Sequence, residues 1–391
     1  MKIERNGSLQ DKNLQNDSTL AIGILGGAFD PFHIEHCTII ESAITDLRLD
    51  ALVLVPSHNP PHKDKHLTPF KDRIEMLKLF SQDKPYIIID TIENDVALDN
   101  SYTSEIIPRL KEKYGGIQYY IIGADGLFSF ETWHAPEKIL QQITLAVAPR
   151  KGYHDINSII NKLTSKYGGE IRILSSNDES AISSSELKAR LELDYDTKGY
   201  IKAEIFSYIK NNGLYREYAQ MLTRLKQMQD DELYAHSART AIFASRYVRV
   251  LKIDFRSAFI ASVLHDVAKQ IRPLKNQYPT NSSKIIHQYD GRVICESVFG
   301  ITDELILDAV EYHTTGKPNM SPLGILVYVA DKLEDDRSFD GIDSIRSTLD
   351  EDFHAGFVKL LQRNVTHIKS KNMPVDELTL KACDYYKINR H

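Results

Sequence analysis

Short apolar runs alternate with segments of helical periodicity through the first half of the chain. Runs rich in Val and Ile, with little polar alternation, are typical of parallel strands covered on both faces. We therefore predict strands at 20–25, 51–56, 86–90, 117–122, 143–148 and 170–174. The intervening spacing predicts helices at 33–47, 70–80, 103–113 and 156–167. Pro108 lies inside the third helix, and we expect it to kink that helix or to restrict it to its C-terminal part.

Strand patterns stop near residue 215, and the remaining chain shows only helical periodicity. The pattern predicts helices at 219–228, 235–251, 256–269, 283–299, 304–312, 323–333 and 353–369. We therefore expect a Rossmann-like α/β domain with a doubly wound parallel sheet, followed by an all-α domain. We set the domains at 19–216 and 217–391, after a polar tail at 1–18 that we expect to be disordered. Ligands of the α/β domain should bind at the carboxyl ends of its strands.

Composition narrows the functional classes. Across 391 residues, 42% are hydrophobic and 26% are charged, as in ordinary globular domains. The net charge of −6 argues against a general nucleic-acid binder. The three cysteines lie far apart, which predicts no disulfide framework and fits a reducing, cytoplasmic environment. No apolar run approaches ~18 residues, so we expect no membrane span. The oligomeric state stays open, a homo-oligomer included.

The motif GGAFDPFHIEH occupies residues 26–36, between the first predicted strand and the first predicted helix. Paired glycines let the backbone approach a ligand closely, and the amides at a helix start attract anions. His33 and His36 are three residues apart, so they share one face of the first helical turn. Together these groups can hold a polyphosphate and its transition-state charge. The alternative is a plain glycine turn with two solvent-exposed histidines; the full string favours the nucleotide.

Further segments follow the later strands of the same domain. Lys63 lies in a loop that prolines stiffen and that could present its side chain to a ligand; the alternative is a plain exposed basic loop. Thr103 begins a helix, and its hydroxyl could contact a ligand or simply cap that helix. After the fourth strand, Gly123 permits close approach and Asp125 can accept from ribose hydroxyls. Trp133 is the only tryptophan. It offers a stacking surface for an aromatic ligand, and a place in the core is an equally good interpretation.

A serine run at 183–185 precedes the last predicted helix of the domain. Serines at a helix start cap it, and their hydroxyls with the first amides also form an anion site. Lys188 follows in the first turn, where it opposes the helix dipole but suits a phosphate.

The glycine-histidine motif resembles the G-G-x-F-D-P-x-H-x-G-H signature of the nucleotidyltransferase superfamily, with Glu35 at the usual Gly position. Residues 22–215 more closely resemble bacterial nicotinate-mononucleotide adenylyltransferases, through the segments PHK (61–63), RIEM (73–76), SYT (101–103), GAD (123–125), PR (149–150) and ISSS (182–185). The family usually has Arg where this chain has Lys188, which keeps the charge but loses bidentate geometry.

This resemblance implies transfer of AMP from ATP, with Mg²⁺, to nicotinate mononucleotide, giving deamido-NAD and pyrophosphate. It implies catalytic roles for His33, His36 and Lys188. It implies that ATP binds through Gly26, Gly27, Phe29, Gly123, Asp125, Ser184 and Ser185. It implies that nicotinate mononucleotide binds through Lys63, Thr103, Trp133 and Arg150. Another acceptor, such as phosphopantetheine, is the alternative, against which Trp133 and the loop at 61–63 argue.

The all-α half carries histidines and aspartates in or at the ends of predicted helices: His236, His265, Asp266, His287, His313 and Asp331. Apolar flanks predict that both Asp266 and Asp331 are buried, and a buried carboxylate without a partner is costly. A single histidine of this kind is more often a core residue whose ring nitrogens are hydrogen-bonded within the protein. The whole set favours a metal site. Mixed imidazole and carboxylate ligands suit Fe, Mn or Zn better than Ca.

The order of these residues resembles HD-domain phosphohydrolases, and most closely bacterial symmetrical diadenosine tetraphosphate hydrolases, through LHDVAK (264–269), HTTG (313–316) and VADKLE (329–334). The resemblance implies one or two metals, Fe first among them, and a metal-bound water as nucleophile. It assigns His236, His265, Asp266 and Asp331 to one metal, and His287 and His313 to a second that Asp266 bridges. Lys269 would neutralise phosphate charge as a catalytic residue, or form a structural ion pair with Asp266.

These resemblances imply a bifunctional enzyme of NAD biosynthesis and nucleotide turnover. It would act on ATP and nicotinate mononucleotide in the first domain, and hydrolyse diadenosine tetraphosphate to two ADP in the second. Two alternatives stay open for the second domain. It acts on another nucleotide, such as (p)ppGpp or a dNTP, or it is a silent regulatory module that only binds nucleotide.

Overall fold

The computed structural model describes residues 20–58, 67–95, 102–150, 153, 155–175, 182–274, 277–280 and 282–388. These residues divide into two compact units. The first holds the described residues up to Ser184 together with Lys198–Leu214; the second holds Ser185–Thr197 and the described residues from Tyr215 onward. The boundary expected at 216/217 differs from this division, in which Ser185–Thr197 groups with the second unit.

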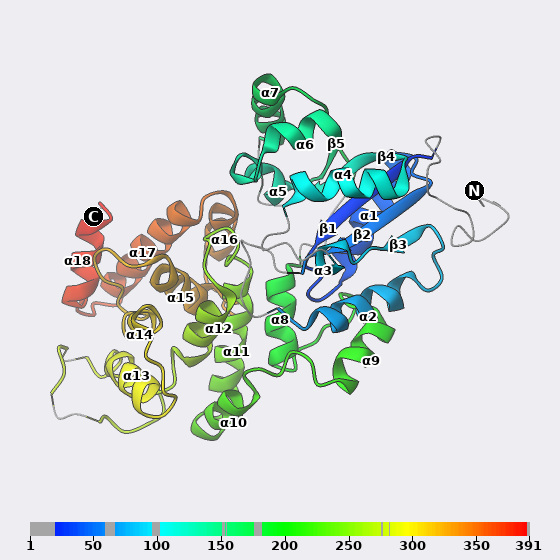
Figure 1. Ribbon diagram of the computed structural model, residues 1–391. Coiled ribbons are helices and arrows are strands. Elements are labelled where there is room, and N and C mark those ends of the chain that lie inside the picture. Colours follow the sequence, from blue (N-terminus) through cyan, green and yellow to red (C-terminus); the bar gives the residue numbers. More distant parts are fainter. Residues whose placement is uncertain are drawn as a thin grey trace. The chain divides into compact units, whose positions relative to one another are not determined.

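A parallel sheet forms the centre of the first unit, in the order β3-β2-β1-β4-β5-β6 (Figure 1). Its strands are β1 (Ile22–Gly27), β2 (Ala51–Pro56), β3 (Ile87–Ile89), β4 (Ile117–Gly123), β5 (Thr144–Ala148) and β6 (Ile171–Ile173). Each predicted strand is present, which confirms the doubly wound parallel sheet. The near-continuous apolar runs are explained by burial: every residue of β2 is buried.

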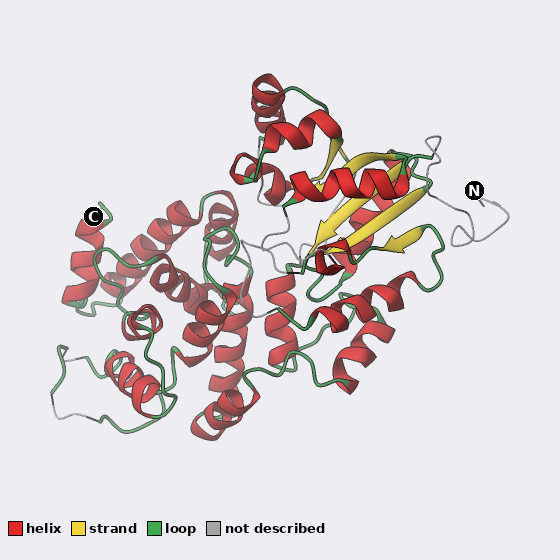
Figure 2. Ribbon diagram, viewed as in Figure 1, coloured by secondary structure: helices red, strands yellow, loops and turns green. Residues whose placement is uncertain are grey.

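Helices flank this sheet (Figure 2). They are α1 (Ile34–Asp46), α2 (Phe70–Ser81), α3 (Ile92–Asp95), α4 (Thr103–Tyr114), α5 (Ala124–Phe128), the 3₁₀ helix η1 (Phe130–Thr132), α6 (Pro136–Gln142), α7 (Ile156–Tyr167) and α9 (Ala203–Asn211). The expectation that Pro108 restricts its helix to a C-terminal part is wrong, because α4 begins at Thr103 and includes the proline. Ile106, Ile107 and Leu110 of this helix are buried against the sheet, and that packing outweighs the lost hydrogen bond.

The direction in which successive strands are added to the sheet reverses between β1 and β4, which are neighbours at its centre. Such a switch point opens a crevice at the carboxyl ends of the two strands. Backbone and side chain approach closely there: a Cβ atom on Gly26 would lie 2.4 Å from the Tyr120 hydroxyl. Tyr120 also hydrogen-bonds the Thr103 side chain, and burial raises the pKa of Tyr120 to about 12. Only glycine fits at position 26.

Arg73 of α2 fastens the loops that surround this crevice. Its side chain is almost fully buried. The guanidinium donates to the carbonyls of Ala28 at 2.8 Å and Ser57 at 2.7 Å, the segments that follow β1 and β2. It also donates to the Thr68 carbonyl at 3.0 Å. One buried cation thus fixes three backbone segments, and helix α2 is attached to the carboxyl edge of the sheet through it.

Helices are the regular secondary structure of the described residues in the second unit. It contains all but the first residue of α8 (Ser184–Glu192), and α10 (Ala219–Met228), α11 (Asp231–Ser245), α12 (Phe255–Leu264), α13 (Ile286–Ser297), α14 (Glu304–Glu311), α15 (Pro322–Leu333), α16 (Ile342–Glu351), α17 (Phe353–Ser370) and α18 (Glu377–Tyr385). The predicted helices are present, while α16 and α18 were not predicted. Its core joins apolar residues of α11, α12, α15 and α17 with Ala189 and Leu193. No helix in the described part of the chain has the length and apolar character needed to cross a membrane.

We predict that Arg73→Met destabilises the first unit by about 3 kcal/mol or more. The change leaves buried carbonyls without a charged donor, and hydrogen bonds to charged groups are the costly ones to lose. Denaturant unfolding followed in the full chain measures the effect. Lys78→Met is the matched control on the same helix, because its ion pair with Glu75 is exposed and should be worth less than about 0.5 kcal/mol. Equal stabilities of the two variants would contradict the fastening role.

Candidate nucleotide site and metal centre

His33 and His36 lie at the start of α1, directly after the glycine turn. His33 is the N-cap residue in extended conformation, and its backbone N–H donates to Nδ1 of His36 at 3.2 Å. The two ring centroids are 4.1 Å apart. The Phe32 ring stacks on His36 at 5.2 Å, with Phe29 edge-on at 5.1 Å. The aromatic residues of the motif thus hold the second imidazole in place.

The imidazole of His33 is buried and neutral. Burial, and then the nearby charge of Arg150, lower the pKa of His33 to about 3. Its Nε2 lies 3.0 Å from the hydroxyl of Ser184. Its Nδ1 is buried and has no hydrogen-bond partner among the described residues.

The end of β4 contributes the next predicted residues. A Cβ atom on Gly123 would lie 2.5 Å from the carboxylate of Asp125, so glycine lets this carboxylate fold back over the strand end. Trp133 is partly exposed and packs against Phe130 at 5.3 Å between ring centroids. One edge of the indole therefore belongs to the core, and the rest remains accessible. His134 stacks on Tyr102 at 4.3 Å, a contact that the sequence analysis did not predict.

The remaining residues predicted for the nucleotide site differ in where the structure places them. Lys63 lies outside the described residues. Arg150 follows β5 and forms an ion pair with Glu35 of α1 at 3.1 Å. Ser185 and Lys188 belong to the second unit, where the Lys188 ammonium lies 6.0 Å from the centre of the Phe255 ring. Their predicted roles at ATP stay predictions.

In the second unit, histidines and aspartates converge from separate helices. Two groups could each hold a metal ion. Their ligand atoms lie within 4.8 Å of one another in each group. The first group consists of His236 (α11), His265 and Asp266 (after α12) and Asp331 (α15), and the second of Asp266, His287 (α13) and His313 (after α14). All six residues that the sequence analysis proposed as ligands are thus brought together.

Asp266 belongs to both groups because its two oxygens point to different histidines. Oδ2 lies 3.4 Å from Nε2 of His265 and 3.7 Å from Nε2 of His236. Oδ1 lies 3.2 Å from Nε2 of His287 and 3.3 Å from Nε2 of His313. Asp266 itself is fully buried. A carboxylate with one oxygen toward each group is the arrangement that bridges two cations.

The imidazoles are oriented through their other ring nitrogens. Nδ1 of His265 lies 2.7 Å from the Ser262 carbonyl, and Nδ1 of His313 lies 2.7 Å from the Val310 carbonyl. A carbonyl can only accept, so both Nδ1 atoms carry a proton and both Nε2 atoms face the cluster, where each can bind a metal once it is unprotonated.

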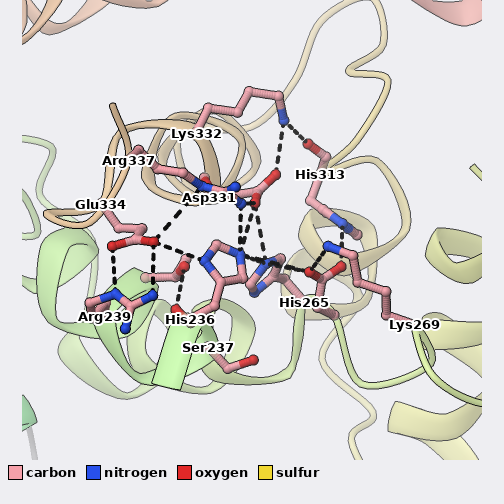
Figure 3. A network of polar contacts seen from close by, with 12 residues as sticks. His236, Ser237, Arg239, His265, Lys269, His313, Asp331, Lys332, Glu334 and Arg337 are labelled. Atoms are coloured by element: carbon pink, nitrogen blue, oxygen red, sulfur yellow. Dashed lines mark hydrogen bonds and ion pairs between the residues drawn. The ribbon is translucent and has the colours of Figure 1, made fainter. Parts of the chain in front are cut away.

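Nδ1 of His236 faces a side chain instead, the buried carboxylate of Glu334 at 3.1 Å. Figure 3 shows Glu334 between His236 and Arg239. The guanidinium of Arg239 donates to Glu334 at 2.8 Å. The sequence analysis quoted Glu334 only as part of a motif. Its spacing of three residues from Asp331, on one helical face, was the available signal.

The charge balance of this centre favours a cation. Burial would lower the pKa of His265, but the carboxylates of Asp266 and Asp331 raise it to about 9. Burial opposes ionisation of Asp266, yet the facing imidazoles keep its pKa well below its usual value. Burial lowers the pKa of His313 to about 4. The carboxylates thus hold their charge and draw positive charge to one imidazole, as expected where the donor set fits a divalent metal.

Basic side chains surround the same centre (Figure 3). Lys269 forms an ion pair with Asp266, which fits the structural alternative named for it in the sequence analysis. Lys332 donates to the His313 carbonyl at 2.8 Å and to Asp331 at 3.1 Å. Arg337 donates to Asp331 at 3.2 Å and is almost half exposed. The Arg337 guanidinium also lies 3.2 Å from Nε2 of His236, so it contacts two of the candidate metal ligands.

Comparison with known proteins agrees with this division. Residues 24–190 match the cytidylyltransferase-like family model and residues 233–336 match the HD domain model. A Mycoplasma genitalium protein named "Probable nicotinate-nucleotide adenylyltransferase/Ap4A hydrolase" is 31% identical over 80% of this chain and 87% of its own length. The chain belongs to this family of fused adenylyltransferase and HD hydrolase proteins. Both resemblances drawn from the sequence are thereby confirmed.

Two shorter proteins match about half of this chain each. A Dehalococcoides mccartyi protein named "Probable nicotinate-nucleotide adenylyltransferase" is 34% identical over 50% of this chain and 98% of its own length. A crystal structure of an HD superfamily hydrolase from Clostridium acetobutylicum is 29% identical and covers 44% of this chain and 97% of that one, with a TM-score of 0.41.

We predict that Glu334→Ala lowers the affinity of the second unit for a divalent metal roughly 10- to 100-fold, because His236 loses the acceptor that fixes its tautomer and orientation. Titration of the metal-free protein with Mn²⁺ measures the change. Asp336→Ala is the control: Asp336 also pairs with Arg239 but is largely exposed. A Glu334→Ala variant that binds Mn²⁺ as tightly as this control would contradict the orienting role.

Proposed function

We propose that the first unit transfers AMP from ATP, with Mg²⁺, to nicotinate mononucleotide, and that the second unit hydrolyses diadenosine tetraphosphate to two ADP. The observation that carries the proposal is the pairing of two unlike sites in one chain. One is a neutral His33 behind a glycine turn, and the other is a carboxylate shared between two metal-ligand groups. Membership of the fused family supports the same pair of activities.

In the first unit, no protein nucleophile is required. The phosphate oxygen of nicotinate mononucleotide attacks the α-phosphorus of ATP, the bond to the β-phosphate oxygen breaks, and pyrophosphate leaves. His33 is neutral, so it acts as a hydrogen-bond donor or acceptor and not as a cation. Its burial keeps this state throughout the neutral pH range. Residues at the crevice therefore act by positioning and by donating to the developing charge.

In the second unit, the ligand groups on either side of Asp266 would hold one or two transition metals, with Fe preferred and Mn or Zn as alternatives. Bound metal supplies an activated water and polarises the scissile phosphate. The residues around the metal have two further roles. The tautomers of three imidazoles are fixed by the carbonyls of Ser262 and Val310 and by the carboxylate of Glu334. The guanidinium of Arg337 neutralises the charge of a substrate phosphate.

Product analysis of the full chain tests both activities. Incubation with Mg²⁺, ATP and nicotinate mononucleotide should give deamido-NAD and pyrophosphate. Incubation with Mn²⁺ and diadenosine tetraphosphate should give ADP alone; ATP plus AMP would contradict symmetrical cleavage. Faster turnover of (p)ppGpp or a dNTP would favour another nucleotide as the substrate, and metal-loaded protein without any hydrolysis would favour a silent module.

We predict that His36→Ala lowers adenylyl transfer by at least ~100-fold, the usual effect of losing one donor at a developing charge. Hydrolysis of diadenosine tetraphosphate should be unchanged, because each unit has its own core. Initial rates of both reactions on one preparation measure the two effects. Adenylyl transfer near the wild-type rate would exclude His36 from the reaction.

We predict that Asp266→Ala removes both metals and hydrolysis together, since one side chain serves both groups. His313→Ala should remove less metal, because His313 contributes to one group only. Metal analysis of the purified proteins measures the difference, with the helical circular dichroism signal as the folding control; adenylyl transfer should persist in both variants. Full metal content in the Asp266 variant, or equal losses in the two variants, would contradict the bridging role.

A further inference from the structure

Glu35 is the one position at which the glycine-histidine motif departs from the family signature, and it carries a buried charge into the nucleotide site. The signature has Gly there, which has neither volume nor charge. In this chain Glu35 is 7% exposed and lies in the first turn of α1. A carboxylate is favourable beside helix-start amides, but these are the amides that an incoming phosphate would use.

The partner of Glu35 comes from the far side of the crevice. Arg150 follows β5, and β4 lies between β5 and β1 in the sheet. One guanidinium nitrogen of Arg150 lies 3.1 Å from Oε2 and 3.3 Å from Oε1 of Glu35. Most of the Arg150 side chain is buried as well. The ion pair therefore crosses the carboxyl end of β4, where ligands of such sheets bind.

Glu35 lies two residues after His33 at the start of α1. Burial first, and then the charge of Arg150, lowers the pKa of His33. When an anionic nucleotide enters the crevice, Arg150 is already paired with Glu35. Its phosphate must share the guanidinium with a carboxylate of the same sign as itself.

We propose that Glu35 is an internal counter-ion that sets the affinity of this site: it weakens the binding of anionic acceptor and product by occupying Arg150. The inference rests on the proposed adenylyl transfer. A weaker hold on substrate and product alike raises KM and speeds product release.

Two effects compete when the charge is removed. Loss of the ion pair frees the Arg150 side chain, which weakens binding through added side-chain entropy. Removal of a buried negative charge a few ångströms from a phosphate strengthens binding, and at an effective dielectric constant of about 20 this Coulomb effect is the larger one. The sign of the change therefore separates a counter-ion from a residue that only orders Arg150.

Glu35→Gln tests the proposal, because it keeps the size of the side chain and removes its charge. We expect KM for nicotinate mononucleotide to fall roughly 10-fold, with kcat equal or lower, and deamido-NAD to bind roughly 10-fold more tightly. KM should also rise more steeply with salt than in the wild type, since the site carries one more net positive charge. Glu35→Asp keeps the charge and is the matched control, expected to stay within about threefold of the wild type.

An unchanged or raised KM in a folded Glu35→Gln protein would overturn the proposal, and thermal unfolding of the full chain reports folding. A second comparison introduces Glu35→Gln into the Arg150→Met variant. If Glu35 acts through Arg150, Glu35→Gln should change KM less than threefold in that background. A full 10-fold fall there would contradict the pairing. Failure of the wild type itself to form deamido-NAD would instead reject the proposed function, so the two failures are distinguishable.

Discussion

The second unit depends on the burial of one carboxylate. Asp266 is fully buried, as is His265 beside it, and neither could remain there as an isolated charge. Separate helices solve this problem by directing imidazoles at its two oxygens. The helix ends after α12 and α14 place His265 and His313, and α11, α13 and α15 supply the remaining ligands. The bundle around them is apolar, and the charged atoms face one another at its centre.

The same requirement explains the residues behind the ligands. Backbone carbonyls three positions earlier orient His265 and His313, so local helix geometry is sufficient for them. His236 lies in the interior of α11, where the carbonyls are used by the helix. It needs a side-chain acceptor, and Glu334 from α15 provides one, with Arg239 to balance its charge.

The sequence predicted those features of the fold that local pattern and composition determine. Apolar runs indicated the strands, and apolar positions at helical spacing indicated helices such as the one at 323–333. Tertiary packing overrode local preference at Pro108, which lies within α4. Long-range pairs left no local signal: Glu35 and Arg150 are separated by 115 positions, so the sequence identified both residues but not their contact. Ser185 and Lys188 were assigned to the first domain by motif, whereas their helix shares the core of the second unit through Ala189.

Anomalous diffraction from crystals soaked in Mn²⁺ can show whether Asp266 joins two cation sites. We expect two anomalous peaks in the second unit, one on each side of the Asp266 carboxylate, about 3.5–4 Å apart as in other two-metal centres. One peak should lie among His236, His265 and Asp331, and the other between His287 and His313. No peak at this carboxylate, or a single peak that leaves either group without metal at saturating Mn²⁺, would show that Asp266 does not join two cation sites.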